Sequence, residues 1–239
     1  MWGSGPAQSL WLSLWVATTA TLLSLILGVA GGALLARRRF PGRELVDALF
    51  CLPLTLPPTV LGYYLLVLLG RHSPLGRLFE ALFGAPLTFT PKAAVVAAMV
   101  HGVPSLIKAC RAALQEVDPL LLRAAASLGA SELRRLWTVA LPVARRPILA
   151  ATMLAFARAL GDFGVTLMIA GDIPGYTQTA ALSIYDAVQG GHDAQALRLA
   201  LVLSGIALSL LYLTNRLSER PPAGSSVAPP PPPTHGEDA

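Results

Sequence analysis

Long uncharged runs of apolar residues alternate along this chain with short segments rich in charge and turn-forming residues. No charged side chain occurs in the 27 residues from Leu10 to Ala36, or in the 23 residues from Ala48 to Gly70. A helix of roughly 20 apolar residues crosses a hydrocarbon layer about 30 Å thick. Each run is therefore long enough to span a membrane.

The pattern predicts an all-α integral membrane helical bundle with about five transmembrane helices. The composition, with 54% hydrophobic and 13% charged residues, also differs from that of soluble domains, in which about 25% of residues are charged. Short helices are expected outside the spans, near residues 75–83 and 179–188. We expect a transmembrane domain over residues 8–217, with spans at Leu10–Ala36, Leu45–Leu69, Ala93–Leu114, Ile148–Gly171 and Leu197–Leu217.

The second expected span carries three prolines, Pro53, Pro57 and Pro58, in the run LPLTLPPTVLGYYLL. Proline lacks a backbone donor and crowds the preceding turn, which predicts a bend or break near the middle of this span. Irregular backbone at membrane depth occurs where protein or a water-filled cavity covers it. A packed kink and a hinge that lines a pathway, with Thr55 and Thr59 beside it, both remain open.

The fourth expected span contains Arg158 and Asp162, four positions apart and hence on one face of a helix. Charges within a span are costly, so they pair, face a cavity, or do both. An intrahelical ion pair and a place in the permeation path are both open. His101 in the third span has no partner at metal-ligand spacing, so we expect it to contact a helix or line a cavity, and we expect no metal site.

The distribution of basic residues predicts the orientation. With five spans and the N-terminus outside, thirteen of the 18 Lys and Arg residues lie on the inner side, four lie outside, and Arg158 lies within a span. Inner loops of membrane proteins are enriched in Lys and Arg. We therefore expect the C-terminus in the cytoplasm, with a disordered Pro-rich tail at residues 218–239. This distribution explains the net charge of +5 without a nucleic-acid partner.

A basic segment rich in Leu and Ala, residues 116–147, joins two expected spans on the inner side. The Asp-Pro pair at 118–119 is typical of a helix start, and Gly129 permits the left-handed turn that ends such a helix. Ser131 is a suitable cap for a second helix, which we expect Pro142 to end. The apolar side chains of this helix–turn–helix have no core of their own, so they meet either a partner protein or lipid headgroups.

Motifs for catalysis and nucleotide binding are absent from the sequence. It contains no GxxxxGK phosphate loop and no HExxH, CxxC or GxSxG motif. We therefore expect no catalytic residue, no enzyme activity and no cofactor in this chain. A substrate is expected to move through the bundle rather than react in it.

The inner segment resembles the EAA loop of ABC-importer permeases, usually written EAA–x3–G–x9–I–x–LP. The matching residues, at the family's spacing throughout, are Arg123, Ala124, Ala125, Gly129, Val139, Leu141 and Pro142. In that family the loop forms a coupling helix, so the resemblance implies docking into a groove of a cytoplasmic ATPase subunit, which carries out the ATP hydrolysis. Arg123 stands where the family has Glu, which implies a complementary acidic change in the partner.

Two further segments resemble permeases for oxyanions. LPLTLPPTVLGYYLL is similar to the second-span region of molybdate and sulfate permeases. Residues 156–185 are similar to the molybdate permease signature, although Asp162 replaces the usual Glu of GEFG. The resemblance covers about residues 8–215 and implies a type I ABC importer permease for molybdate, in the inner membrane. A sulfate, thiosulfate or tungstate importer, or a channel or scaffold without ATPase coupling, are the alternatives.

The resemblance also implies the partners of this chain. It implies a homodimer with the pathway at its two-fold axis, two ATPase subunits inside, and a periplasmic or extracellular molybdate-binding protein outside. An oxyanion pathway is expected to offer hydroxyl groups and helix-end amides. The pathway residues that we expect are Thr55, Pro57, Pro58, Thr59, Arg158, Asp162 and Thr166.

Overall fold

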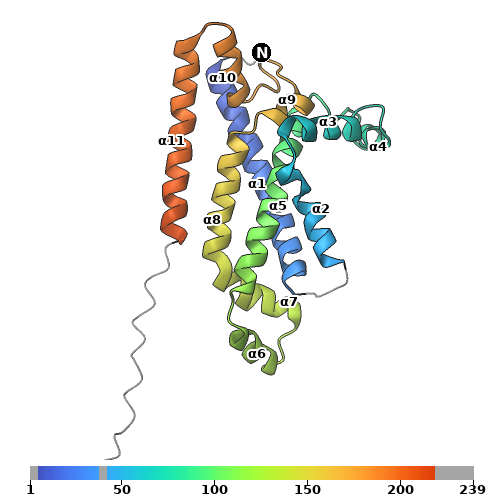
Figure 1. The fold of residues 1–239 in the computed structure, drawn as a ribbon, viewed down its shortest axis with the longest axis vertical. Coiled ribbons are helices and arrows are strands. Elements are labelled where there is room, and N and C mark those ends of the chain that lie inside the picture. Colours follow the sequence, from blue (N-terminus) through green and yellow to red (C-terminus); the bar gives the residue numbers. More distant parts are fainter. Residues whose placement is uncertain (1–4, 38–41, 219–239) are drawn as a thin grey trace, which may run out of the picture.

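The computed structural model describes residues 5–37 and 42–218, which form helices joined by turns and loops (Figure 1). No strand occurs within these ranges. The tail expected at residues 218–239 lies outside the described residues except for its first residue. In chain order the helices are α1 (Pro6–Arg37), α2 (Arg43–Thr55), α3 (Pro58–Leu69), α4 (Pro74–Phe83), α5 (Pro91–Gln115), α6 (Pro119–Ser127), α7 (Glu132–Arg135), the π-helical turn η1 (Leu136–Ala140), α8 (Leu141–Leu160), α9 (Gly164–Ala170), α10 (Ala180–Gln189) and α11 (Asp193–Ser218).

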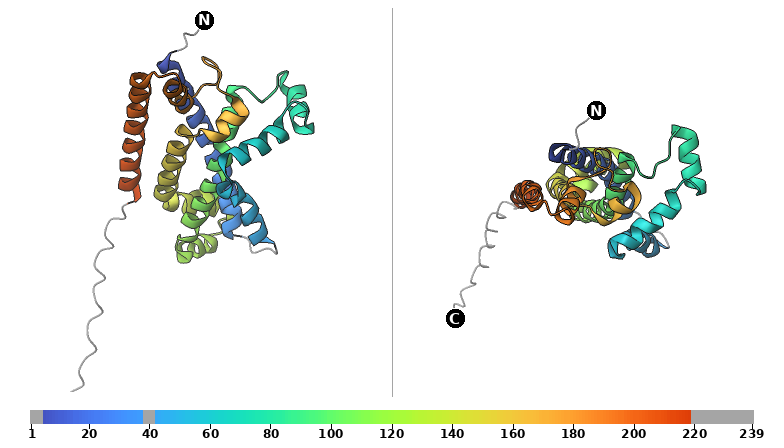
Figure 2. Two further views of the ribbon diagram at one scale, coloured as in Figure 1. Left: turned by 45° about the horizontal axis from the view of Figure 1, so that its top comes forward. Right: turned by 90° about the horizontal axis from the view of Figure 1, so that it is seen from above.

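Three long helices, α1, α5 and α8, lie side by side, and α11 packs on α8 (Figure 1, Figure 2). The bent α2–α3 pair adds a further span if it is taken as one. The short helices α4 and α10 confirm those expected outside the spans. The predicted all-α, multi-pass bundle is therefore confirmed, since four described helices are long and apolar enough to cross a membrane: Pro6–Ala36, Pro91–Gln115, Glu132–Leu160 and Asp193–Arg216.

Glycines allow α1 and α5 to approach closely. A Cβ added to Gly28 would lie 2.6 Å from the Leu106 Cβ, and one added to Gly32 would lie 2.7 Å from the Cys110 Cβ. Among lipid tails, which are as apolar as leucine, helices associate through van der Waals contacts between such closely packed backbones. The glycines of the first span thus determine its place against α5.

We expect Gly32→Val to lower the thermal stability of the purified protein in detergent. The added side chain would overlap the Cys110 Cβ and the Arg111 amide nitrogen, and overpacking of this kind costs about 1–3 kcal/mol. The temperature at which half of the protein remains monodisperse on gel filtration measures the effect. Gly205→Val is the control, because a Cβ at Gly205 on α11 meets nothing within 4 Å. An equal loss in both variants would contradict the close-packing argument.

The second span is broken, as its prolines predict. α2 ends at Thr55 and α3 begins at Pro58, with an angle of 112° between them. Leu56 has an extended backbone, because the ring of the following proline disfavours the helical conformation. As a result α3 and α4 project sideways from the bundle (Figure 2). α2 is held to α5 by an ion pair between Arg111 Nη1 and Asp47 Oδ2 at 3.0 Å.

The fourth span does not match the expected Ile148–Gly171. The helix continues from α7 through η1 and α8 and ends at Leu160, so its expected continuation to residue 171 is wrong. Gly161 follows as the C-cap, and the Asp162 carboxylate then accepts a hydrogen bond from the Thr166 amide at 3.2 Å. An Asp side chain that bonds nearby amides favours a new helix start over continuation of the old helix.

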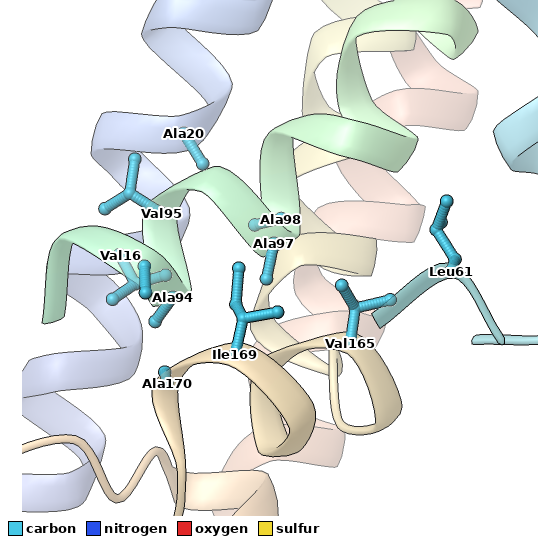
Figure 3. Packing of buried hydrophobic residues seen from close by; sticks show 11 residues of the cluster. Val16, Ala20, Leu61, Ala94, Val95, Ala97, Ala98, Val165, Ile169 and Ala170 are labelled. Carbon is cyan, nitrogen blue, oxygen red and sulfur yellow. The ribbon is translucent and has the colours of Figure 1, made fainter. Parts of the chain in front are cut away.

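Two apolar clusters hold the bundle together at different depths. In the first, shown in Figure 3, Ala97 of α5 packs with Val165 and Ile169 of α9, Leu61 of α3 and Val16 of α1. The second joins α1, α5, η1 and α8 nearer the opposite end, through Ala33, Cys110, Leu136, Ala140 and Ala144. The part of α5 between the two clusters carries the polar residues of the site.

Candidate functional site

A cavity of about 520 Å³ lies between α3, α5, α8 and the start of α9. Most of its wall is apolar, including Ala98, Ala155, Leu167 and Met168. An apolar wall with a few convergent polar groups is typical of a ligand-binding cavity. The polar side chains that line it are those of Thr59, His101, Ser105, Arg158 and Asp162.

The cavity lies near the middle of α5 and beside the C-terminal end of α8. His101 lies ten residues after the start of α5 and 14 before its end, or about 15 Å and about 21 Å at 1.5 Å per residue. Arg158 lies 17 residues along α8 from Leu141, or about 26 Å. Both distances place the polar groups well away from the α6 end, so this site is here called the mid-depth cavity.

Arg158 is exposed on the cavity side of the structure and is not neutralised there. Its guanidinium forms no ion pair within 4.0 Å with a carboxylate of the described residues. A charged side chain at such depth is strongly unfavourable in contact with lipid. The face that carries Arg158 is therefore a face that meets water, a ligand or another polypeptide.

Asp162 is engaged by α9 rather than by Arg158. Both the amide and the hydroxyl of Thr166 donate to its Oδ2. The intrahelical ion pair that remained open from the sequence is therefore wrong, since α8 ends before residue 162. The backbone turns at Gly161 and directs the carboxylate to the first turn of α9.

The structure brings together only some of the expected pathway residues. Pro58, Thr59, Arg158 and Asp162 line the mid-depth cavity. Thr166 is buried behind Asp162, with 1% of its surface exposed.

Thr55 and Pro57 are absent from the lining of this cavity. The Thr55 hydroxyl donates instead to the Leu52 carbonyl of its own helix. His101 of α5 also lines the cavity, as one of the two roles expected for it predicts, and so does Ser105, which was not predicted. Their spacing of four within an apolar span is the sequence signal that could have identified them as one polar face.

At the opposite end of the bundle, α6 ends in the left-handed turn that Gly129 predicts. Gly129 has φ of +78°, a conformation that side chains with a Cβ disfavour. Its amide donates to Ala126 at 2.9 Å, and the Ala130 amide donates to Ala125 at 3.1 Å. This is a Schellman motif. The four-residue spacing between Ala125 and Gly129 is therefore the spacing that a Schellman motif requires between the last turn of a helix and the glycine that ends it.

The other predicted ends of this segment are partly confirmed. Asp118 Oδ1 caps α6 by accepting from the Leu120 amide at 2.8 Å, and Ser131 Oγ caps α7 by accepting from the Arg134 amide at 3.4 Å. The prediction that Pro142 ends the second helix is wrong. The wider π-helical turn η1 ends two residues before Pro142. The chain therefore continues as a helix although proline has no backbone N–H to donate.

Apolar side chains on α6, α7 and η1 are exposed at this end, where α6 protrudes beyond the bundle (Figure 1). Arg123 and Ala124 are also exposed on α6. Arg145 and Arg146, expected in the loop, lie in the first turns of α8. Exposed large apolar side chains that gather on neighbouring helices, beside charged residues, indicate an interaction site. We call its large residues the loop patch: Leu120, Leu121, Leu128, Leu133 and Trp137.

The end that carries α10 has a smaller cavity of about 270 Å³, whose lining includes the amide side chains of Gln8, Gln178 and Gln195. Across it, Gln8 Nε2 of α1 donates to the Gly175 carbonyl at 2.8 Å. In the same loop burial raises the pKa of the Asp172 carboxyl, an effect opposed by a hydrogen bond from Gln178. These amide groups provide a polar surface that is chemically distinct from the loop patch.

The described helices thus form a multi-pass bundle with a mid-depth cavity that carries a few polar groups, and with a protruding capped loop at one end. The structure shares its fold with solved ABC transporters. The chain belongs to the family of binding-protein-dependent transport system inner membrane components, whose family model matches residues 28–220. This confirms the resemblance to ABC-importer permeases.

Several curated relatives match nearly the whole chain. It is 40% identical over 212 residues to the molybdenum transport system permease protein ModB of Escherichia coli strain K12, covering 88% of this chain and 93% of that protein. ModB of Haemophilus influenzae is 40% identical over 210 residues, covering 87% and 92%. The sulfate transport system permease protein CysT of Salmonella typhimurium is 33% identical over 209 residues, covering 87% and 75%.

Two solved structures share the fold at low sequence identity. The bacterial alginate ABC transporter in complex with an alginate pentasaccharide-bound periplasmic protein has a TM-score of 0.72 at 14% identity, covering 90% of this chain and 78% of that chain. The inward-facing MetNI methionine ABC transporter has a TM-score of 0.64 at 17% identity, covering 87% and 94%.

Proposed function

We propose that this chain is the membrane permease subunit of a molybdate importer driven by a separate ATPase. The observation that supports this most directly is the mid-depth cavity with Arg158, in a chain about 40% identical to molybdenum transport permeases. A cation that meets a cavity attracts an anion there. The chain itself contributes no catalytic residue, because ATP hydrolysis belongs to the partner.

The loop patch is proposed as the contact with the ATPase. Its apolar side chains surround a capped α6 with exposed Arg123, and its spacing matches the coupling loop of the family. Ala124 and Ala125 lie in the last turns of α6 before the Gly129 turn, and Leu141 and Pro142 begin α8. A rigid connection of this kind can transmit a movement of the ATPase to a spanning helix.

The polar surface at the α10 end is proposed as the outer face, which receives a molybdate-binding protein. The excess of Lys and Arg near the loop patch supports this orientation, with the N-terminus outside and the C-terminus inside. A second copy of this chain would complete the pathway, because the cavity side of each bundle carries an exposed Arg158 that is unfavourable against lipid.

The proposed mechanism follows from these contacts. ATP draws the two ATPase subunits together and moves both loop patches toward the two-fold axis. Rocking of the spanning helices then opens the outer face, and hydrolysis returns the inward-facing state. The 112° break between α2 and α3 lies beside the cavity, where a change of helix direction alters access to it.

We expect vesicles that contain the complete complex to take up labelled molybdate in the presence of ATP and binding protein. Unlabelled tungstate, which resembles molybdate in shape and charge, is expected to compete, and sulfate is expected to compete at least tenfold less well, a difference of about 1.4 kcal/mol. Uptake without ATP would support a channel instead. Equal competition by sulfate would support the sulfate importer.

The sulfate alternative has one specific observation in its favour, the 33% identity to the CysT permease. That match is weaker than those to the molybdenum permeases and covers less of the relative. Membership of a binding-protein-dependent family favours coupled import over a channel or scaffold. Molybdate import therefore remains the preferred proposal.

A further inference from the structure

We propose that the mid-depth cavity is a transient binding site for the transported oxyanion, in which Arg158 attracts the anion and Asp162 limits how long it stays. This inference rests on the proposed function, since it assumes that an oxyanion crosses this bundle. It goes further by placing a binding site within the permease itself, where Arg158 strengthens and Asp162 weakens the binding of the anion. Both residues line the same cavity, on either side of the turn at Gly161.

The available donors favour an anion in this cavity. Arg158 is exposed and unpaired with any described carboxylate, whereas Asp162 already accepts two hydrogen bonds from Thr166. Carboxylate charge that is compensated by donors repels an anion less than a free carboxylate does. The Asp162 carboxylate therefore repels an anion less strongly than the Arg158 guanidinium attracts it, and the lining favours an anion on balance.

Two further side chains supply polarity around the proposed site. The exposed Thr59 hydroxyl forms no hydrogen bond with another described residue, so it is available to donate. The Ser105 hydroxyl is committed to the His101 carbonyl at 2.9 Å, so it offers an acceptor rather than a donor. The donors to an anion are thus Arg158 and Thr59.

The same geometry makes binding weak. At about 520 Å³ the cavity has the size of a site for a drug-sized ligand, so a small oxyanion enters with part of its water shell. The Asp162 carboxylate opposes the anion across the same space. A pathway must bind its ion strongly enough to admit it and weakly enough to release it. Two opposite charges that line one cavity without forming an ion pair provide this balance between entry and release.

The test measures occupancy of the cavity by molybdate without relying on transport. Ser105→Cys places a thiol in the lining, in a Cys51→Ser background that removes the half-buried native cysteine. Cys110 is fully buried and stays in place. The permease is purified with its ATPase, without binding protein or ATP. The rate at which a charged thiol reagent modifies residue 105 is then measured by mass spectrometry at increasing molybdate concentration.

Molybdate is expected to slow the modification, and the two charge variants are expected to shift the half-protecting concentration in opposite directions. Arg158→Gln raises it by about tenfold, because a cation near the anion is lost. Asp162→Asn lowers it by a smaller factor, about threefold, because a partly compensated repelling charge is lost while the amide oxygen can still cap α9. Lys108→Gln is the matched control, since Lys108 lies on α5 outside the cavity lining, and no shift is expected.

The outcomes separate this inference from the proposed function. If the complete wild-type complex takes up molybdate but molybdate does not protect the thiol, the cavity site is wrong and the importer stands. If Arg158→Gln and Asp162→Asn shift protection in the same direction, the opposing roles are wrong. If molybdate protects the thiol but ATP-driven uptake is absent, the importer proposal fails instead. If Arg158→Gln does not assemble with the ATPase, Arg158→Lys replaces it, and molybdate is expected to protect the thiol at residue 105 in that variant. Asp162→Asn then still tests whether loss of the carboxylate charge lowers the half-protecting concentration.

Discussion

A Gly129→Trp variant is expected to separate from its ATPase during purification and to lose ATP-driven uptake. Gly129 has φ of +78°, where a residue with a Cβ costs about 1–2 kcal/mol. Nothing lies within 4 Å of its Cβ position, so the indole would extend into the space beside the loop patch that we assign to the partner. We expect obstruction to add to this strain, and a roughly 100-fold loss of affinity, or about 2.8 kcal/mol, is the result that we predict.

The control for this variant is Gly84→Trp. Gly84 follows α4 as Gly129 follows α6, has φ of +70°, and also has nothing within 4 Å of a Cβ. Backbone strain is therefore matched, while the position lies on a different part of the molecule (Figure 1). The ATPase is expected to co-purify with this control. If Gly129→Trp retained both ATPase association and ATP-driven uptake, the assignment of the coupling loop would be refuted.

Reversal of charge at Arg123 is expected to weaken the same contact by about tenfold or more. Arg123 is exposed on α6, where the family motif has Glu, so we infer that the ATPase groove presents a carboxylate to it. Arg123→Glu replaces attraction by repulsion between close charges, which costs several kcal/mol in an interface. Arg123→Gln removes the attraction only and is expected to have a smaller effect. The affinity of the ATPase for permease in nanodiscs measures both.

Two observations check that the effect is local. Arg198→Glu changes the net charge by the same amount, but Arg198 lies on α11 near the end away from the loop patch, so affinity is expected to stay unchanged. Raising the ionic strength is expected to reduce the difference in ATPase affinity between the wild-type permease and the Arg123→Gln variant, because salt screens exposed charges. Tighter binding by Arg123→Glu would mean that the groove is basic and that our assignment is inverted.

Local sequence determines much of this fold. The apolar runs predict α1, α5 and α11, because a chain segment in lipid must satisfy its backbone hydrogen bonds internally, as a helix does. The prolines predict the break between α2 and α3, and Asp118, Ser131 and Gly129 predict helix ends through hydrogen bonds that span only a few residues. These features depend on neighbours in the chain, so they are visible without the structure.

Tertiary structure decided where the fourth span begins and ends, and which residues line the mid-depth cavity. The π-helical turn η1 places Leu136 and Ala140 in the apolar cluster with Cys110 of α5, and this packing carries the helix past Pro142. The cavity depends on α3, α5, α8 and α9 meeting at one depth, which brings His101 to the residues near 158–162.

The chain alone therefore indicated the class of the protein, the break in the second span and the capped ends of α6, because each follows from the length of an apolar run or from residues that are close together in the sequence. The tertiary structure alone decided that Arg158 remains unpaired with a described carboxylate while Asp162 turns to Thr166. That outcome depends on where α8 stops and on the side chains that distant helices place around it, and four-residue spacing in the sequence carries no information about either.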